Sequence, residues 1–165
     1  MAEPNIVATR IDERLVHGQG QLWIKSLGVN TVIVANDEAA ADKMSQMLMK
    51  TVIPGNIAMR FFTLQKTIDI IHKAAPAQKI FLIVKTPADA LKLVEGGVPI
   101  PEINVGNIHN AEGKEKVTRS IFLGPEDKAA ILEMADKHGV KFNTRTTPSG
   151  ADGSVEVDIV DFCRK

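Results

Sequence analysis

The chain has 165 residues, and its 20 Lys and Arg residues balance its 20 Asp and Glu residues exactly in formal charge. This length suits one globular domain, taken as residues 1–165, that can bury a core without disulfides or a structural metal. Zero net charge argues against binding a nucleic-acid backbone through bulk charge. No apolar run approaches the roughly 20 residues that cross a bilayer. The single cysteine, Cys163, excludes a disulfide framework and a cysteine-rich zinc site, so the sequence indicates a reduced cytoplasm.

Short apolar runs alternate with amphipathic stretches from one end of the chain to the other. The runs are rich in β-branched residues and predict strands at 5–9, 31–35, 57–62, 79–84, 102–106, 120–123 and 140–143. A helix is expected at 21–27, ending at Gly28, and two more are expected over 37–50 and 64–74. Met44, Met47 and Leu48 follow helical spacing, and the methionines are interpreted as core residues.

The second half of the chain carries clear helix boundaries. Thr86-Pro87 and Gly124-Pro125 predict helix starts, and Gly139 marks the end of the second of these helices. Residues 155–162 alternate in polarity, which favours a half-exposed strand over a tail that packs elsewhere. The whole pattern predicts a single α/β domain with a mostly parallel central sheet of about seven strands and helices on both faces.

The densest group of polar side chains follows the first predicted strand. Residues 10–17, Arg-Ile-Asp-Glu-Arg-Leu-Val-His, hold two guanidinium groups, two carboxylates and an imidazole. Ligands of open α/β sheets bind at the carboxyl ends of strands. Neutral imidazole is a good nucleophile near pH 7, arginine matches phosphate oxygens with a planar fork of donors, and a helix N-terminus attracts anions. The segment therefore favours a phosphoryl group carried on His17, against the alternative of an ordinary solvated loop.

At residues 10–19 the sequence reads Arg-Ile-Asp-Glu-Arg-Leu-Val-His-Gly-Gln. It resembles the active-site signature of IIB subunits in the mannose/fructose/sorbose class of bacterial sugar phosphotransferase systems. Similar segments occur at 34–37, 85–87 and 104–107, and the resemblance extends to about Pro148. Residues 62–68 and 96–99 are most similar to members specific for N-acetylgalactosamine or galactosamine. One departure is Gly20, where the family commonly has an apolar residue, and it leaves open where the first helix begins.

The resemblance implies a phosphoryl carrier that works as a protein-histidine–sugar phosphotransferase. A IIA partner would phosphorylate Nδ1 of His17, and His17 would pass the group to N-acetylgalactosamine or a related sugar held by membrane subunits IIC and IID. Arg10 and Arg14 match the motif arginines and would neutralise the phosphoryl oxygens, while Asp12 would hold the loop. The chain would then be cytoplasmic and peripherally associated with the permease. No metal, cofactor or nucleic acid is implied, and a homo-oligomer is left open.

Further residues are candidates for supporting roles. Gly18 allows close backbone approach, and Thr86 begins a helix at the same edge of the sheet, so both are kept as phosphoryl-binding candidates, although Thr86 is most simply an N-cap. His109 follows the strand at 102–106 and is a candidate supporting or partner-contact residue. Cys163 lacks the loop–helix setting of a phosphocysteine.

Two interpretations are possible for each of three other residues near the carboxyl ends of the predicted strands. Asn36 and Asp37 are either a helix cap or part of the cleft, and Trp23 either packs under the loop or is exposed for docking. The alternative function is a regulatory paralogue that binds partners without carrying phosphate, and the intact His17 argues against it.

Overall fold

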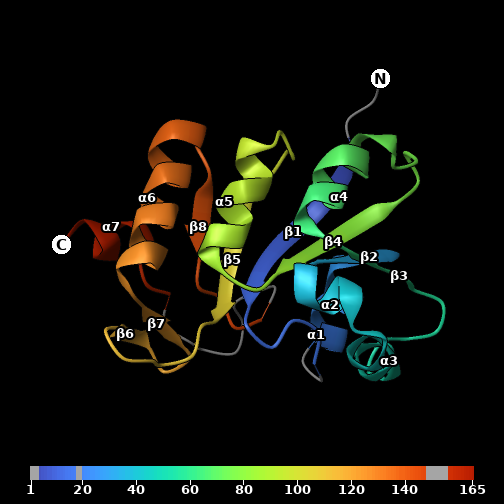
Figure 1. Ribbon diagram of the computed structural model, residues 1–165, viewed down its shortest axis with the longest axis horizontal. Coiled ribbons are helices and arrows are strands. Elements are labelled where there is room, and N and C mark those ends of the chain that lie inside the picture. The colour runs from blue at the N-terminus through green and yellow to red at the C-terminus, as the bar shows by residue number, and fades with distance from the viewer. Residues whose placement is uncertain (1–3, 18–19, 148–155) are drawn as a thin grey trace.

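The architecture is that of a parallel sheet between two layers of helices. The structure is a computed structural model that describes residues 4–17, 20–147 and 156–165. Its central sheet has the strand order β3-β2-β4-β1-β5-β8, and all neighbouring strands pair in parallel (Figure 1). The strands are β1 (Asn5–Asp12), β2 (Thr31–Ala35), β3 (Ala58–Phe62), β4 (Lys79–Val84), β5 (Glu102–Asn107) and β8 (Lys141–Asn143).

The helices cover both faces of this sheet. One layer contains α1 (Gly20–Leu27), α2 (Asp37–Ala41) and α3 (Lys43–Thr51). The other contains α4 (Leu64–Ile70) with the 3-10 turn Ile71–Lys73, α5 (Pro87–Glu95), α6 (Pro125–His138) and α7 (Ile159–Arg164). None of the helices in the described ranges is long and apolar enough to cross a membrane.

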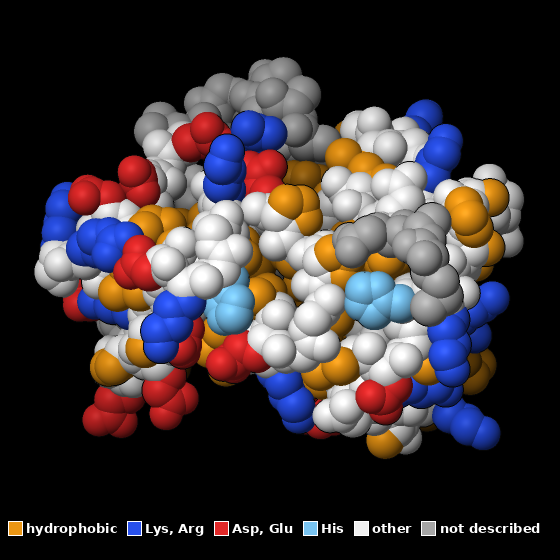
Figure 2. All heavy atoms as spheres, turned by 90° about the horizontal axis from the view of Figure 1, so that it is seen from above, with side chains coloured by type: hydrophobic (Ala, Val, Ile, Leu, Met, Phe, Trp, Pro, Cys, Tyr) orange, Lys and Arg blue, Asp and Glu red, His pale blue; other side chains and the backbone are white. Residues whose placement is uncertain are grey.

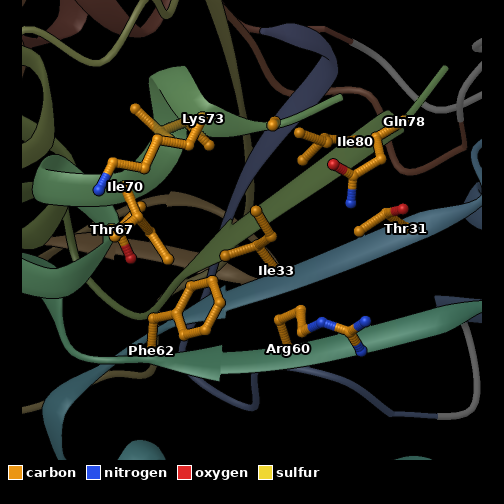
Figure 3. A pocket seen from close by; sticks show the side chains of 11 residues that line it. Thr31, Ile33, Arg60, Phe62, Thr67, Ile70, Lys73, Gln78 and Ile80 are labelled. Carbon is orange, nitrogen blue, oxygen red and sulfur yellow. The ribbon is translucent and has the colours of Figure 1, made fainter. Parts of the chain in front are cut away.

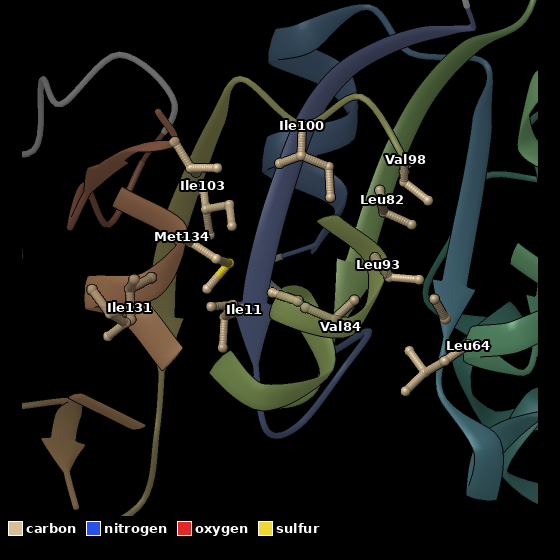
Figure 4. Close-up of a cluster of buried hydrophobic side chains, with 14 of the residues drawn as sticks. Ile11, Leu64, Leu82, Val84, Leu93, Val98, Ile100, Ile103, Ile131 and Met134 are labelled. Carbon is tan, nitrogen blue, oxygen red and sulfur yellow. The ribbon is translucent and has the colours of Figure 1, made fainter. Parts of the chain in front are cut away.

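Strand β4 explains why the central strands read as continuous apolar runs. Its residues Ile80, Leu82 and Val84 point into the core under α4, α5 and α6, whereas Phe81 and Ile83 point into the core under α1 and α3. Figure 4 shows Leu82 and Val84 beside Ile11 of β1 and Leu93 of α5. Both faces of β4 exclude water from Ile80 to Val84, so each of these five positions favours an apolar side chain.

The topology brings the end of β1 to a natural binding position. The connection after β1 leads to α1 on one face of the sheet, and the connection after its neighbour β4 leads to α5 on the other face. Adjacent connections that leave on opposite sides open a crevice at the carboxyl ends of the two strands. The polar segment after β1 lies at this point.

The expected fold class is confirmed, but the central sheet has six strands rather than about seven. The segment predicted at 120–123 forms β7 (Ile121–Leu123), which pairs antiparallel with β6 (Glu115–Thr118) in a separate two-stranded sheet. A short run of apolar residues predicts a strand but does not say which sheet it joins.

The prediction of one helix over 37–50 was wrong, because Asp42 divides it into α2 and α3. The backbone of Asp42 is extended, and its carboxylate accepts hydrogen bonds from the backbone N–H groups of Met44 and Ser45, which makes it the N-cap of α3. The new helix axis turns the apolar stripe outward. Met44 and Met47 are 73% and 68% exposed, so their interpretation as core residues was wrong, while Met49 is buried.

The prediction of a strand at 155–162 was also wrong. Residue 155 lies outside the described ranges, and Ile159–Arg164 form helix α7, with the carboxylate of Asp158 accepting a hydrogen bond from the backbone N–H of Asp161. Ile159 and Cys163, four residues apart, are both buried. A four-residue spacing also fits helix, so the period-two pattern of so short a segment was not decisive.

Candidate functional site

Strand β1 is longer than the sequence indicated, and it carries Arg10 and Asp12 as strand residues rather than loop residues. The chain turns immediately after Asp12. The carboxylate oxygen Oδ1 of Asp12 accepts a hydrogen bond from the backbone N–H of Arg14 at 2.9 Å, and its carbonyl accepts one from Leu15 at 2.9 Å. Leu15 takes the left-handed conformation, with φ of 59°. This tight turn brings His17 back over the end of the strand.

Asp12 is the centre of the site. Its side chain is fully buried and receives Nε and Nη2 of Arg14 at 3.1 and 3.2 Å and Nη2 of Arg10 at 3.3 Å. Nε2 of His17 lies 3.0 Å from its Oδ2 atom. Burial by itself raises the pKa of Asp12, but the hydrogen bonds from Arg14, the charge of Arg10 and the contact with His17 outweigh it and lower the pKa. The carboxylate is therefore ionised at neutral pH.

An ionised carboxylate accepts hydrogen bonds and donates none. In the neutral imidazole of His17, Nε2 must therefore carry the proton that points at Asp12, and the lone pair of the ring lies on Nδ1. The side chain of His17 is 21% exposed, so it can be reached from outside while Asp12 remains shielded.

Arg10 is held in place by residues from two other elements. Its Nη1 donates to Oδ1 of Asn104 in β5 at 2.5 Å, and its guanidinium carbon lies 4.9 Å from the ring centre of Trp23 in α1. Nδ2 of Asn104 in turn donates to Oδ1 of Asn143 and to the carbonyl of Arg145. Burial lowers the pKa of Arg10, and the neighbouring Asp12 offsets part of that effect. The guanidinium is thus a fixed positive charge behind the carboxylate.

The roles of Asn104 and Trp23 were not established by sequence reasoning. Asn104 is 4% exposed in a strand that is otherwise apolar at its centre, and a buried amide of this kind signals a polar partner. Trp23 is 5% exposed and stacks on Phe81, so it packs under the loop instead of being available for docking.

Gly106 leaves the space that the Arg10 guanidinium occupies, because a Cβ atom at this position would overlap it. We expect Gly106→Ala to displace Arg10 and to destabilise the fold by about 1–3 kcal/mol, as overpacking of a buried site does. Urea unfolding measures the effect. The matched control is Gly55→Ala, because Gly55 has no atom within 4 Å of its added Cβ. Equal unfolding midpoints for the two variants would contradict this account.

A cleft of about 360 Å³ opens beside the turn. It is lined by residues of the turn, Arg14, Leu15 and Val16, together with Asn36, Glu38, Ala39, Asp42, Ser45, Leu48, Met49 and Lys85. Lys85 lies 3.9 Å from the carboxylate of Glu38. The cleft therefore brings the ends of β1, β2 and β4 together, with Arg14 37% exposed at its wall.

The remaining predicted residues take different places. Asn36 both caps α2, through a hydrogen bond from Ala39, and lines the cleft, whereas Asp37 accepts a hydrogen bond from Leu64. Thr86 caps α5 through a hydrogen bond from the backbone N–H of Asp89, which is its simpler interpretation. Gly18 lies outside the described residues.

His109 and Cys163 lie in separate surroundings. Nδ1 of His109 is 3.0 Å from the carboxylate of Glu13, which also contacts Lys114. Cys163 is buried against α6, and burial raises its pKa to about 11, opposite to the change that activates a thiol nucleophile. Among residues 4–17, 20–147 and 156–165, no group of three His, Cys, Asp or Glu side chains is arranged to hold a metal ion.

A second hollow, of about 300 Å³, lies between α4 and the sheet (Figure 3). Its walls include Ile33 of β2, Phe62 of β3 and Ile70 of α4, and the cationic side chains of Arg60 and Lys73 are at its border. None of its lining residues belongs to the turn after β1, so the hollow is separate from the His17 site.

The comparisons with known proteins agree with this geometry. Residues 6–162 match the family described as PTS system sorbose subfamily IIB component. The chain belongs to this family. It is 54% identical over 132 residues to the N-acetylgalactosamine-specific phosphotransferase enzyme IIB component 2 of Escherichia coli strain K12, which covers 79% of this chain and 84% of that relative.

Two solved structures of IIB components extend the agreement to three dimensions. An N-acetylgalactosamine IIB component from Streptococcus pyogenes superposes with a TM-score of 0.93 at 60% identity, covering 98% of this chain and 99% of that one. The IIB domain of the sorbose permease from Klebsiella pneumoniae gives a TM-score of 0.83 at 30% identity, covering 95% and 94%. This IIB component is accordingly a phosphoryl carrier in sugar uptake.

Proposed function

We propose that His17 is the covalent phosphoryl acceptor of this IIB component. The observation that carries the proposal is the 3.0 Å contact between Nε2 of His17 and the buried carboxylate of Asp12. Because that contact keeps the proton on Nε2, the lone pair on Nδ1 is the nucleophile. Arg10 and Arg14 also bind this carboxylate and hold it in place, so the ring is oriented before any donor arrives.

The first transfer moves a phosphoryl group from a phosphohistidine of the IIA component to His17. The Nδ1 lone pair forms an N–P bond as the N–P bond of the donor breaks and the donor imidazole leaves. Arg14, at the wall of the cleft, supplies positive charge near the phosphoryl oxygens, and Arg10 supplies it from behind Asp12. Fixed charges of this kind stabilise a loose phosphoryl-transfer transition state without reorganising.

The second transfer passes the group to a sugar held by the membrane components IIC and IID. The oxygen of a sugar hydroxyl forms the O–P bond as the N–P bond of His17 breaks; Nδ1 regains its lone pair, and the hydroxyl proton leaves to solvent. The sugar is proposed to be N-acetylgalactosamine, because the 54%-identical relative is described as specific for it and the Streptococcus pyogenes structure is described as an N-acetylgalactosamine IIB component. The chain acts in the cytoplasm at the surface of the permease in this scheme, as one IIB domain spanning residues 1–165.

The rival function is a regulatory paralogue that binds partners and carries no phosphate. Such a protein has no need to keep a buried carboxylate on the imidazole, or to bury a guanidinium behind that carboxylate at the cost of its desolvation. Both features are present here, and they favour the carrier.

Intact mass measurement tests the proposal. The purified chain is incubated with the IIA component of an N-acetylgalactosamine-specific system, the general phosphotransferase proteins and phosphoenolpyruvate. We expect a gain of one phosphoryl group, about 80 Da, that is labile in acid and maps to the peptide containing His17. No gain with a fully phosphorylated IIA component would reject the carrier function and favour the regulatory paralogue. A gain that maps to another peptide would reject His17 as the acceptor.

A further inference from the structure

Helix α3 presents three large apolar side chains to solvent on one face. Met44, Met47 and Leu48 are 73%, 68% and 65% exposed, and their i, i+3, i+4 spacing makes them neighbours on the helix surface. Most other large apolar side chains of the described residues are buried or half-buried. Exposed apolar residues gathered in this way mark interaction sites more often than single ones do. We call these three side chains the α3 ridge.

The α3 ridge is continuous with the site of His17. Leu48 lines the same cleft as Arg14, Leu15 and Val16, and Val16 directly precedes His17. A protein that delivers a phosphoryl group to Nδ1 of His17 must bring its own imidazole to within bonding reach of that atom. The donor therefore covers the protein surface next to the cleft, and the α3 ridge is the apolar part of that surface.

The charges around the α3 ridge are mostly positive. Helix α3 contains Lys43 and Lys50 and no Asp or Glu. The cleft beside it is lined by Arg14 and Lys85 and by two carboxylates: Glu38, which lies 3.9 Å from Lys85, and Asp42, which is engaged in capping α3. Figure 2 shows the opposite end of the molecule, toward the top of Figure 1, where Lys, Arg, Asp and Glu side chains are interspersed with hydrophobic ones.

These charges distinguish the two proteins that must approach His17. The cytoplasmic surfaces of membrane subunits carry an excess of Lys and Arg, which repel a helix flanked by lysines. A donor domain that carries an anionic phosphoryl group and presents carboxylates complements it. Methionine side chains are flexible and polarizable, which suits contacts that form and release at every turnover.

We infer that the α3 ridge is the docking surface for the phosphoryl donor, a IIA component whose contact face is apolar and edged by carboxylates. This inference rests on the proposed function. The α3 ridge would bind the donor and leave the chemistry at His17 unchanged, so its loss should raise the KM for the donor far more than it changes the turnover rate.

The experiment compares the wild-type chain with Met44→Gln/Met47→Gln, because glutamine keeps the helix propensity and the size of the side chain. The matched control is Glu133→Gln/Lys137→Gln on the exposed surface of α6, near its C-terminal end. The rate of phosphorylation is measured against the concentration of the phosphorylated IIA component. A parallel reaction uses phosphoramidate, a small phosphoryl donor that needs no docking surface.

We expect the KM for the IIA component to rise about tenfold or more in the ridge variant, with wild-type values for the control and equal phosphoramidate rates for all three chains. An unchanged KM overturns the inference. So does a fall in the phosphoramidate rate, which would mean that the ridge shapes the site itself. If only transfer to sugar in permease membranes is impaired, or if the variant loses a dimer in sedimentation, the ridge serves another partner and the inference is rejected.

Failure of the proposed function would look different. The wild-type chain itself would then take no phosphoryl group from the IIA component, whatever the ridge variant does. The inference would fall with it, but the cause would be evident from the wild-type reaction alone.

Discussion

A His17→Ala variant is expected to take up no acid-labile phosphoryl group from the IIA component, a loss limited only by the sensitivity of the mass measurement. The side chain of His17 is partly exposed, at 21%, and Asp12 keeps its hydrogen bonds from Arg14 and Arg10 in the variant. Unfolding free energy should therefore fall only modestly, by about 1–3 kcal/mol, the scale of hydrogen bonds to a charged group. Loss of function with little loss of stability is the signature of a chemical role.

The matched control for His17→Ala is His109→Ala. His109 also follows a strand at the functional edge and also contacts a carboxylate, that of Glu13, at 3.0 Å. That pair is more exposed, with 58% of the His109 side chain accessible, and Glu13 is additionally held by Lys114. His109→Ala should take up one phosphoryl group as the wild-type chain does. Uptake lost in His109→Ala and kept in His17→Ala would reverse the assignment.

The amino-acid sequence predicted the parts of this protein that depend on local patterns. The apolar runs predicted five of the six central strands to within one residue at each end, and Pro87, Pro125 and Gly139 marked helix boundaries that the structure confirms. Strand β1 extends further than expected, through Asp12. Arg10 and Asp12 at its end pair with β5 and are both buried, and their side chains contact each other.

The parts that failed depend on what neighbouring elements do. The sequence pattern predicts Asp42 to be an interior residue of one long helix. In the structure Asp42 caps α3 and divides the helix, and Met44 and Met47 are exposed to solvent. The motif named Arg10, Asp12, Arg14 and His17 as candidates, but only the fold brings Asn104, 94 residues from Arg10 in the chain, to the guanidinium. A contact between residues so far apart in the chain produces no short-range sequence pattern from which it could be predicted.

An Asp12→Asn variant is expected to lose at least about 100-fold in the rate of phosphoryl uptake, because a neutral amide no longer requires the proton of His17 to lie on Nε2. Loss of the carboxylate that orients a catalytic histidine lowers the rate of serine proteases by about 10⁴, which sets the scale. Stopped-flow or quenched-flow transfer from the IIA component measures it. The matched control is Glu13→Gln. Glu13 is the next carboxylate along the chain, and it pairs with His109 and Lys114. This variant should retain most of the rate.

The same variant should change how the stability of the fold depends on pH. The pKa of Asp12 is lowered in the folded chain, so its ionised form contributes stability above the ordinary value of about 3.9, and that contribution is lost as the pH falls through the lower, folded pKa. Asp12→Asn has no proton to gain there and leaves Arg10 buried beside a neutral group, at a cost of about 3 kcal/mol near pH 7. Urea unfolding of both chains between pH 7 and pH 3 should therefore show the difference shrinking with acid. A difference that stays constant over this range would mean that folding leaves the pKa of Asp12 unchanged. A difference that grows with acid would mean that Asp12 is protonated in the fold, and the tautomer argument for His17 would then fail.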